Sequence, residues 1–301
     1  MNHKKIALTL ATALAIALFG CNKPSTPEAS TNSDLSLQEQ ELQTKTKQLA
    51  VETLGLKLEA NVQSGHRDNF SGLRTDNITF TQRLDSRTYV AYDQRFSSTK
   101  ENGIYKEADE ALLKRSHELL ERLKIPVAEI ASEKVVTEKT QIGERDSKTG
   151  KFKLEPVEPG KKWAMTSRQV EGIPVFSSRA TIGLSANGEI GFLEVHWPEI
   201  PAKVTEEARR YRDVVSKTWR APELKGARVE SVTAGILHSP AAGTAMDVVP
   251  VIRVIYAPLD KRVGKKPVAY VDPEGKPVTM PRVLLKPPRE ELKTERVSPK
   301  G

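Results

Sequence analysis

The chain has 301 residues, a formal net charge of +8 and a hydrophobic content of 38%. This length fits one large domain or two smaller ones, and the modest apolar content leaves room for tails and loops. The one cysteine excludes an internal disulfide, and no residues have the spacing of a metal-ligand cluster, so an ordinary hydrophobic core must supply the stability.

The first twenty residues have the parts of an export signal. Lys4 and Lys5 give it a positive start, and residues 6–19 carry no charge. This apolar run is shorter than the about 20 residues of a membrane span and suits the core of a signal peptide. Residues 18–21, Leu-Phe-Gly-Cys, then resemble the lipobox of bacterial lipoproteins, although the phenylalanine is bulkier than usual.

The lipobox resemblance implies cleavage before Cys21 and lipidation of its thiol and its freed amine. Several acyl chains at about 0.8 kcal/mol per buried CH₂ make such an anchor durable. An ordinary secretory signal is the alternative, but its cleavage sites, at 13–15 or 15–17, would lie inside the apolar core. In the family, Asn22 after the cysteine indicates the outer membrane of a Gram-negative host, facing the periplasm or the surface.

Residues 1–20 are therefore predicted to be a signal peptide, whose removal lowers the formal charge from +8 to +6. Residues 21–36, rich in Ser, Thr, Pro and Asn, are predicted to be a flexible tether. Residues 37–76 are predicted to be a polar helix, opened by Ser36 and Glu39 in a capping-box pattern, followed by a loop over 59–76.

Residues 77–202 are expected to form a first helix-plus-sheet unit. Alternating runs at its start predict a hairpin, and apolar residues at helical spacing predict a helix over 103–123. Asn187 and Gly188 predict a two-residue hairpin turn, because both accept the positive φ that such a turn requires. Further strands are predicted at 135–142, 151–157, 163–170, 176–184 and 190–197.

Residues 203–281 repeat this order in a second unit. Thr205 is predicted to cap a helix, and strands follow at 228–237, 248–257 and 268–271. Residues 282–301 are expected to be a basic, disordered or frayed tail. The sequence thus predicts an α+β fold, with two successive helix-plus-antiparallel-sheet units after a disordered tether, and leaves open whether the units share one sheet.

Two segments of the body resemble known modules. Residues 169–197, with Val-Glu-Gly-Ile-Pro-Val at 170–175 and Asn-Gly-Glu-Ile at 187–190, are similar to the propeptide module of thermolysin-type and fungalysin-type metallopeptidases. Residues 270–278 are similar to the strand-turn-strand end of PepSY domains. The resemblance implies a free-standing helix-on-sheet module that inhibits or chaperones a peptidase, or acts as an envelope interaction module.

Residues 117–121, His-Glu-Leu-Leu-Glu, are close to the zinc-peptidase motif, in which two histidines one helical turn apart share a metal. Glu121 stands where the second histidine belongs, so we interpret these residues, His117 included, as the exposed side of a helix. Glu194 and His196 alternate on one strand face and are suited to proton transfer, but no motif places a nucleophile beside them.

Other candidates have simple structural interpretations. His66 and His238 lack a partner at metal-ligand spacing. Gly188 and Gly191 lead into a strand rather than a helix, so they do not form a phosphate loop. A basic loop contains Lys261, Arg262, Lys265 and Lys266, and it either contacts an anionic polymer or keeps a hairpin soluble. The tryptophans are expected to pack in the core or at sheet edges rather than to hold a sugar. They are Trp163, Trp197 and Trp219.

The leading hypothesis is a lipid-anchored, non-enzymatic envelope protein that binds a protein partner through an exposed sheet edge. We expect no cofactor, metal, nucleic acid or small-molecule substrate. One alternative is a binder of anionic cell-wall or lipopolysaccharide polymer through residues 261–266 and the tail, with salt-sensitive binding. The other is an envelope hydrolase built around Glu194 and His196, which requires a concave pocket there.

Overall fold

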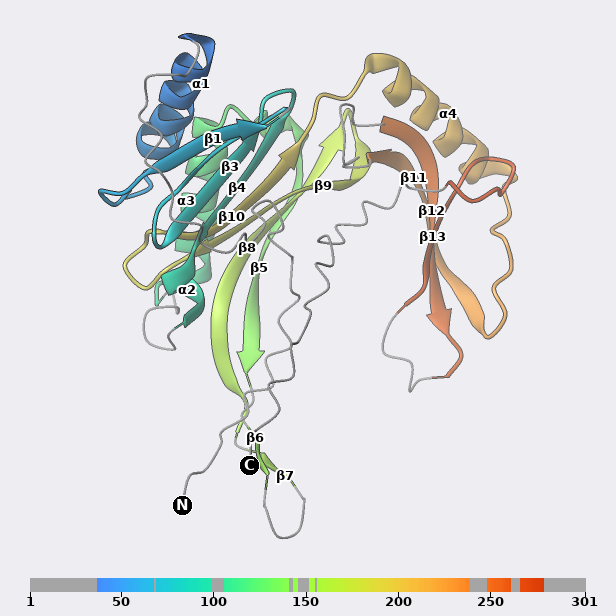
Figure 1. Cartoon of the computed structure of the whole chain (residues 1–301). Helices are drawn as coiled ribbons and strands as arrows, with labels where there is room; N and C mark the ends of the chain where they lie inside the picture. Colours follow the sequence, from blue (N-terminus) through green and yellow to red (C-terminus); the bar gives the residue numbers. More distant parts are fainter. Residues whose placement is uncertain are drawn as a thin grey trace, which may run out of the picture.

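The computed structural model describes residues 37–67, 69–98, 106–140, 143–145, 152–154, 156–238, 248–260 and 266–278. The signal peptide, Cys21, the tether and the basic tail therefore lie outside the described residues. The fold is α+β, as predicted, and its main element is a largely antiparallel sheet of eleven strands (Figure 1).

The first lobe contains three helices and eight strands of this sheet. The helices are α1 (Leu37–Gln48), which continues as a π-helical turn (Leu49–Thr53), α2 (Gln94–Ser98) and α3 (Asp109–Arg122). The strands are β1 (Gln63–Arg67), β2 (Phe70–Arg74), β3 (Ile78–Arg83), β4 (Arg87–Asp93), β5 (Ile130–Thr140), β8 (Glu158–Val170), β9 (Ile173–Leu184) and β10 (Ile190–Trp197).

The second lobe contains α4 (Ala202–Lys217) and the strands β11 (Ala227–His238), β12 (Val248–Pro258) and β13 (Val268–Val271). A separate two-stranded sheet, β6 (Gly143–Arg145) with β7 (Phe152–Leu154), lies at the far end of the long β5–β8 ladder (Figure 1). A short 3₁₀ turn, Val127–Glu129, precedes β5.

The two predicted units share one sheet, because β9 belongs to both. The strand order is β1-β2-β3-β4-β10-β9-β11-β12-β13, and β8 pairs with β9 and β5. The C-terminal half of β9 pairs with β10, whereas Val175 near its start pairs with Ile236 of β11 in parallel. The sheet is therefore antiparallel except at this junction, where β11 takes the place of β10 beside β9.

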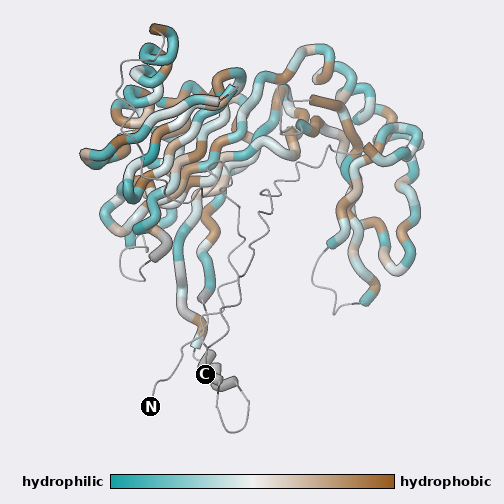
Figure 2. Tube along the Cα trace, in the orientation of Figure 1, coloured by the Kyte–Doolittle hydropathy of each residue, from teal (hydrophilic) through white to brown (hydrophobic). Residues whose placement is uncertain are grey.

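β9 also contributes to two hydrophobic cores. Ala180 and Ile182 enter the first core with the helices of the first lobe, while Ile173 and Val175 pack with Ala208 of α4. Figure 2 shows hydrophobic stretches where β11 and β12 pass beneath α4. Phe176 was predicted to share a face with Ala180, but it does not join Ala180 in the first core. Its ring packs instead over Gly235 of β11 and beside Tyr270 of β13.

The loop predicted over 59–76 is wrong, because β1 and β2 lie within it. Their polar composition hid the strand pattern. Ser71 is buried because its hydroxyl meets that of Thr46 at 2.6 Å, and Gly72 lies so close to β3 that a Cβ would stand 2.8 Å from the Phe80 carbonyl oxygen. Polar and glycine residues thus replace the apolar alternation of an ordinary strand.

The hairpin between β9 and β10 is confirmed, but its predicted two-residue turn is wrong. The loop runs over 185–189, and of Asn187 and Gly188 only Gly188 has a positive φ, of 79°. A two-residue turn joins β8 to β9 instead. There Glu171 and Gly172 have φ of 50° and 77°, and Val170 pairs with Ile173.

Two helices begin at residues other than those predicted. Ala108 has an extended backbone, so α3 begins at Asp109 and not near residue 103. Residues 101–105 are not among the described residues. α4 begins earlier than predicted, after Pro201, whose fixed φ suits the start of a helix. Thr205 is therefore buried in the second turn and does not cap the helix.

Two glycines lie beneath the buried Phe96 ring, and close packing explains why these positions have no side chain. The Phe96 ring is buried over Gly191 and Gly183 and meets Trp163 edge-on, with ring centroids 5.5 Å apart. A Cβ at Gly191 would overlap the Phe96 ring, whereas a Cβ at Gly65 on β1 would meet no atom within 4 Å.

We expect Gly191→Ala to lower the free energy of unfolding by about 1–3 kcal/mol, because the added methyl overpacks the core. Urea denaturation followed by circular dichroism measures this change. Gly65→Ala is the matched control and should leave the midpoint nearly unchanged. Equal midpoints for the two variants would contradict the packing described for Phe96.

Candidate functional site

Strand β1 is the exposed end of the sheet. Among the described residues it pairs only with β2, and residues 63–66 are all exposed. The register to β2 and from β2 to β3 is regular, without a bulge. A flat, regular edge of this kind presents unpaired N–H and C=O groups to another strand.

The hydrogen-bond pattern shows which residues of β1 face outward. The Leu84 amide donates to Asn69 O, and the Thr75 amide donates to Ile78 O, so the odd-numbered residues of β2 point their backbone groups toward β3. The even-numbered residues of β2 then pair with 63, 65 and 67 of β1. The backbone groups of Ser64 and His66 therefore point to the open edge, because pairing alternates along an antiparallel ladder.

The other two edges of the sheet are blunted. At β13, the Val278 amide donates to Tyr270 O at 2.8 Å and Pro277 bridges to Val271, so residues 276–278 cover that edge. The β5 ladder has two register irregularities, and Lys134 and Lys139 are exposed along the strand. Bulges and lysines are features that prevent strand addition, so β1 is the edge best suited to it.

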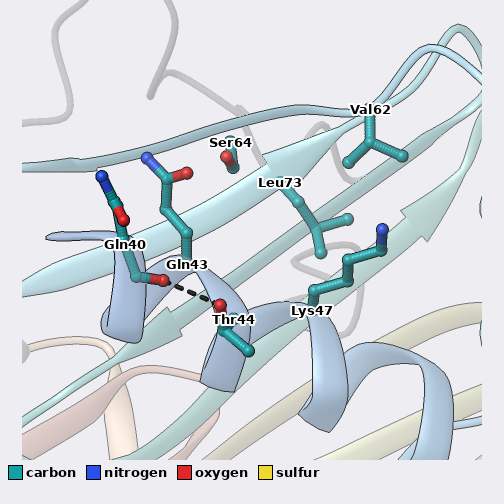
Figure 3. A pocket seen from close by; sticks show the side chains of 7 residues that line it. All are labelled: Gln40, Gln43, Thr44, Lys47, Val62, Ser64 and Leu73. Atoms are coloured by element: carbon teal, nitrogen blue, oxygen red, sulfur yellow. Dashed lines mark hydrogen bonds between the residues drawn. The ribbon is translucent and has the colours of Figure 1, made fainter. Parts of the chain in front are cut away.

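A polar groove runs between α1 and β1. It encloses about 400 Å³, and Figure 3 shows Gln40, Gln43 and Lys47 of α1 across from Ser64 and Val62. A second hollow, on the other side of β1, is lined by Gln63, Arg74 and Asp76, among others. An extended segment laid along β1 would thus meet side chains on both faces of the strand.

Helix α1 is fixed to the sheet by buried polar contacts rather than by an apolar stripe. The Thr46 hydroxyl donates to Leu42 O, contacts Ser71 Oγ at 2.6 Å and accepts from Gln82 Nε2 at 3.0 Å. The π-helical turn then places Ala50 and Leu54 in the core. One wall of the groove is therefore held rigidly against the sheet.

The charge of this edge is mixed, with one cation in the groove. His66 Nε2 lies 3.5 Å from Glu39, and Lys45 pairs with Glu41 at 2.7 Å. Lys47 lines the groove and makes no ion pair to any described residue. The sequence led us to expect an exposed sheet edge but did not indicate β1 as that edge, because residues 59–76 lack the usual strand pattern.

A third hollow, of about 710 Å³, lies beside the junction of the lobes. Two buried arginines line it. Arg83 binds Asp85, with Nε to Oδ1 at 2.6 Å, and Arg168 binds Glu129, with Nε to Oε2 at 2.8 Å. Both of these guanidinium groups already have carboxylate partners, whereas the exposed Arg87 also lines the hollow.

Glu194 and His196 do lie together, as their alternation on one strand predicted. His196 Nε2 is 2.9 Å from Glu194 Oε1, and Arg179 Nη2 is 3.2 Å from Glu194 Oε2. Burial alone would raise the pKa of Glu194, but the His196 hydrogen bond and the Arg179 charge hold it below its usual value. Neither side chain lines any of the three hollows above.

His238, which the sequence left isolated, is brought close to this pair. Its side chain is buried, neither ring nitrogen has a hydrogen-bond partner, and its backbone amide donates to Ser177 Oγ at 2.9 Å. Burial, with smaller effects from His196 and Arg168, lowers the pKa of His238 to about 4.

The remaining candidates are placed in structural roles. His117 lies 3.5 Å from both Glu121 and Glu133, and the described residues hold no group of three or more His, Cys, Asp or Glu suited to a metal.

In the basic loop, Lys266 pairs with Glu230, and residues 261–265 are not among the described residues. The tryptophans pack as expected: Trp163 meets Phe96 and Phe192, Trp197 Nε1 donates to Glu129, and Trp219 Nε1 donates to Pro273 O.

None of the helices in the described part of the chain has the length and apolar character to cross a membrane. No protein-family model matches the sequence, and no curated protein matches it at a significant level.

Two solved structures are similar to the chain. An uncharacterized protein from Eubacterium rectale is 13% identical, with a TM-score of 0.39, over 78% of this chain and 81% of that one. The YpeB C-terminal domain of Bacillus megaterium is 10% identical, with a TM-score of 0.31, over 76% of this chain and 97% of that one. At these scores neither structure identifies a function for the chain.

We expect acid to destabilise the fold through His238. Between the unfolded pKa of about 6.5 and the native value of about 4, the unfolded chain binds a proton at His238 that the native chain does not bind. Stability is therefore lost as the pH falls through this window, by up to about 3 kcal/mol.

Urea unfolding at pH 7.5 and at pH 4.5 measures this loss. His238→Leu, which removes the titrating ring without leaving a buried polar group, should lose clearly less stability between the two pH values than the natural chain. His66→Gln on the exposed β1 should behave as the natural chain does. An unaltered pH dependence in His238→Leu would show that His238 does not cause the loss.

Proposed function

We propose that this chain is a lipid-anchored lipoprotein of the bacterial envelope whose body is a non-enzymatic, protein-binding module. The open edge of β1 is the observation that supports this proposal most directly. An extended segment of the partner would pair with β1 as an added strand, and its alternate side chains would enter the groove beside α1. The interaction would thus combine main-chain hydrogen bonds with side-chain selection.

Three features of β1 favour strand addition over other modes of binding. Its outward N–H and C=O groups, at Ser64 and His66, lack a strand partner among the described residues. Its register is regular, so a second strand meets no bulge. The groove is open and has both polar and apolar side chains in its lining, as suits an extended peptide with alternating side chains.

The partner that we propose to test first is an envelope or secreted peptidase. The reason is the resemblance of residues 169–197 to the propeptides of metallopeptidases. In the structure this segment forms the β8–β9 turn and the β9–β10 hairpin at the centre of the sheet. The segment therefore supports the scaffold, while β1 supplies the contact.

We expect Ser64→Pro to weaken partner binding strongly without unfolding the protein. Proline removes an N–H that points away from β2, so the β1–β2 ladder keeps its bonds while an incoming strand loses one. Ser64→Ala is the matched control, since it removes the hydroxyl and keeps the amide. The measurement is a pull-down from host envelope and secreted fractions with tagged, unlipidated residues 22–301, read by quantitative mass spectrometry.

The expected result is one protein recovered in near-stoichiometric amount by the natural chain and by Ser64→Ala, with recovery reduced at least about tenfold for Ser64→Pro. Circular dichroism confirms that the variants are folded. If no specific protein is recovered, or if Ser64→Pro recovers it as well as Ser64→Ala does, strand addition at β1 is wrong.

The anchor is tested separately at Cys21. We expect the natural chain to incorporate a labelled fatty acid and to fractionate with membranes, because several acyl chains give durable attachment. Cys21→Ser should lose both the label and the membrane association. A Cys21→Ser chain that stays labelled would refute lipidation at this residue, and an unlabelled natural chain would refute the lipoprotein assignment.

A further inference from the structure

A second feature, half-buried, lies in the other lobe on the face of the sheet opposite α4. In β12, Ile252, Val254 and Tyr256 belong to the core beneath α4. Since successive side chains of a strand point to opposite faces, Arg253 lies on the face away from α4. Tyr270 of β13, which stands between the core residues Ala269 and Val271, lies on the same face.

Arg253, Phe176 and Tyr270 form a stack on this face, which we call the Arg253 platform. The Arg253 guanidinium carbon lies 4.1 Å from the centroid of the Phe176 ring, and the Phe176 and Tyr270 rings are 5.9 Å apart. Arg253 and Tyr270 are direct cross-strand partners. The platform therefore joins three strands: β9, β12 and β13.

Gly235 of β11 makes the stack possible. A Cβ at this position would lie 2.6 Å from the Phe176 ring, so the ring rests directly on the glycine backbone. In this position the ring reaches across β11 to Arg253. A side chain on Gly235 would push Phe176 away and leave the guanidinium without its aromatic support.

Arg253 is a half-buried cation that has no carboxylate partner among the described residues. Its Nε is buried and makes no hydrogen bond, and Arg253 has no ion pair with any described residue. Arg83 and Arg168, in contrast, bind Asp85 and Glu129. Burying an unpaired charge is costly, so a cation held in this way is better explained by a partner from outside the chain.

We propose that the Arg253 platform binds a carboxylate side chain of an acidic peptide. Guanidinium donors match the two oxygens of a carboxylate, and the aromatic rings beside Arg253 exclude water from the pair. The platform has a single cation, which balances one carboxylate but not a phosphate dianion. Its residues do not line the groove beside α1 or the other hollows described above, and they spread over three neighbouring strands, so a contact with a peptide fits the site.

This site is independent of strand addition, because β1 lies at the opposite end of the sheet. The test is an NMR titration of unlipidated residues 22–301 that follows the Arg253 Nε–H signal. The probes are an acetylated, amidated Gly-Val-Glu-Val-Gly peptide, the same peptide with Gln or with phosphoserine in the centre, and free glutarate.

The Glu peptide should shift the Arg253 signal in a saturable manner, and the Gln peptide should bind at least about tenfold more weakly, since a charge-assisted bidentate pair is lost. Arg253→Gln should weaken binding of the Glu peptide by a similar factor, measured by shifts of neighbouring backbone amides. Tyr270→Phe and Phe176→Leu, which keep the cation, should each weaken it about threefold or more, by removing the hydroxyl and the stacked ring. Arg228→Gln, which removes an exposed charge from β11 in the same lobe, should bind as the natural chain does.

Equal binding of the Glu and Gln peptides would overturn the proposal. So would unchanged binding by Arg253→Gln, or an effect of Arg228→Gln as large as that of Arg253→Gln. If the phosphoserine peptide binds more tightly than the Glu peptide, the ligand is a phosphate and not a carboxylate. If glutarate binds as tightly as the Glu peptide, a peptide is not the specific ligand. If Arg253→Gln fails to fold, Tyr270→Phe and Phe176→Leu decide the question, since unchanged binding by both would equally reject the platform.

Discussion

The guanidinium group of Arg168 connects the elements that meet where β10 leaves the sheet. It donates to Glu129 beside β5 at 2.8 Å, to Ser178 of β9 at 3.2 Å and to the Pro198 carbonyl oxygen after β10 at 2.6 Å. Glu129 also accepts from the indole of Trp197. Because one buried cation joins four segments, removing it would leave the half-buried Glu129 without its ion-pair partner and the Pro198 carbonyl oxygen without this donor.

This arrangement explains how one sheet carries two lobes. At Arg168 the register between β8 and β9 shifts, so that Ser167 pairs with Arg179 while Arg168 pairs with Val175. The additional residues of β9 allow the strand to bend and to supply different faces to the two cores. β1 and the Arg253 platform then lie at opposite ends of one continuous hydrogen-bonded framework, which holds both proposed contacts at a fixed separation.

Local patterns in the sequence predicted most of the strands. β10 and β13 have the predicted limits, and 251–256 is a central strand because it is apolar on nearly both faces. Contacts between distant residues were not predictable in this way. β1 and β2 are strands because Ser71 meets Thr46 of α1, and the Arg253 platform forms because Gly235 lies beneath Phe176. A turn at Glu171 and Gly172 was missed because glutamate is uncommon at positive φ.

The shared use of β9 has a consequence for the evolution of this architecture. A chain that ended after Trp197 would lack β11, and the backbone of β9 near Val175 would lose its neighbour. Ile173 and Val175, now buried against α4, would become exposed on that same edge. Such a shortened ancestor would present an adhesive, apolar strand and would tend to aggregate. The second lobe is therefore not a module that lineages can gain or lose freely, and the two lobes are expected to be inherited together.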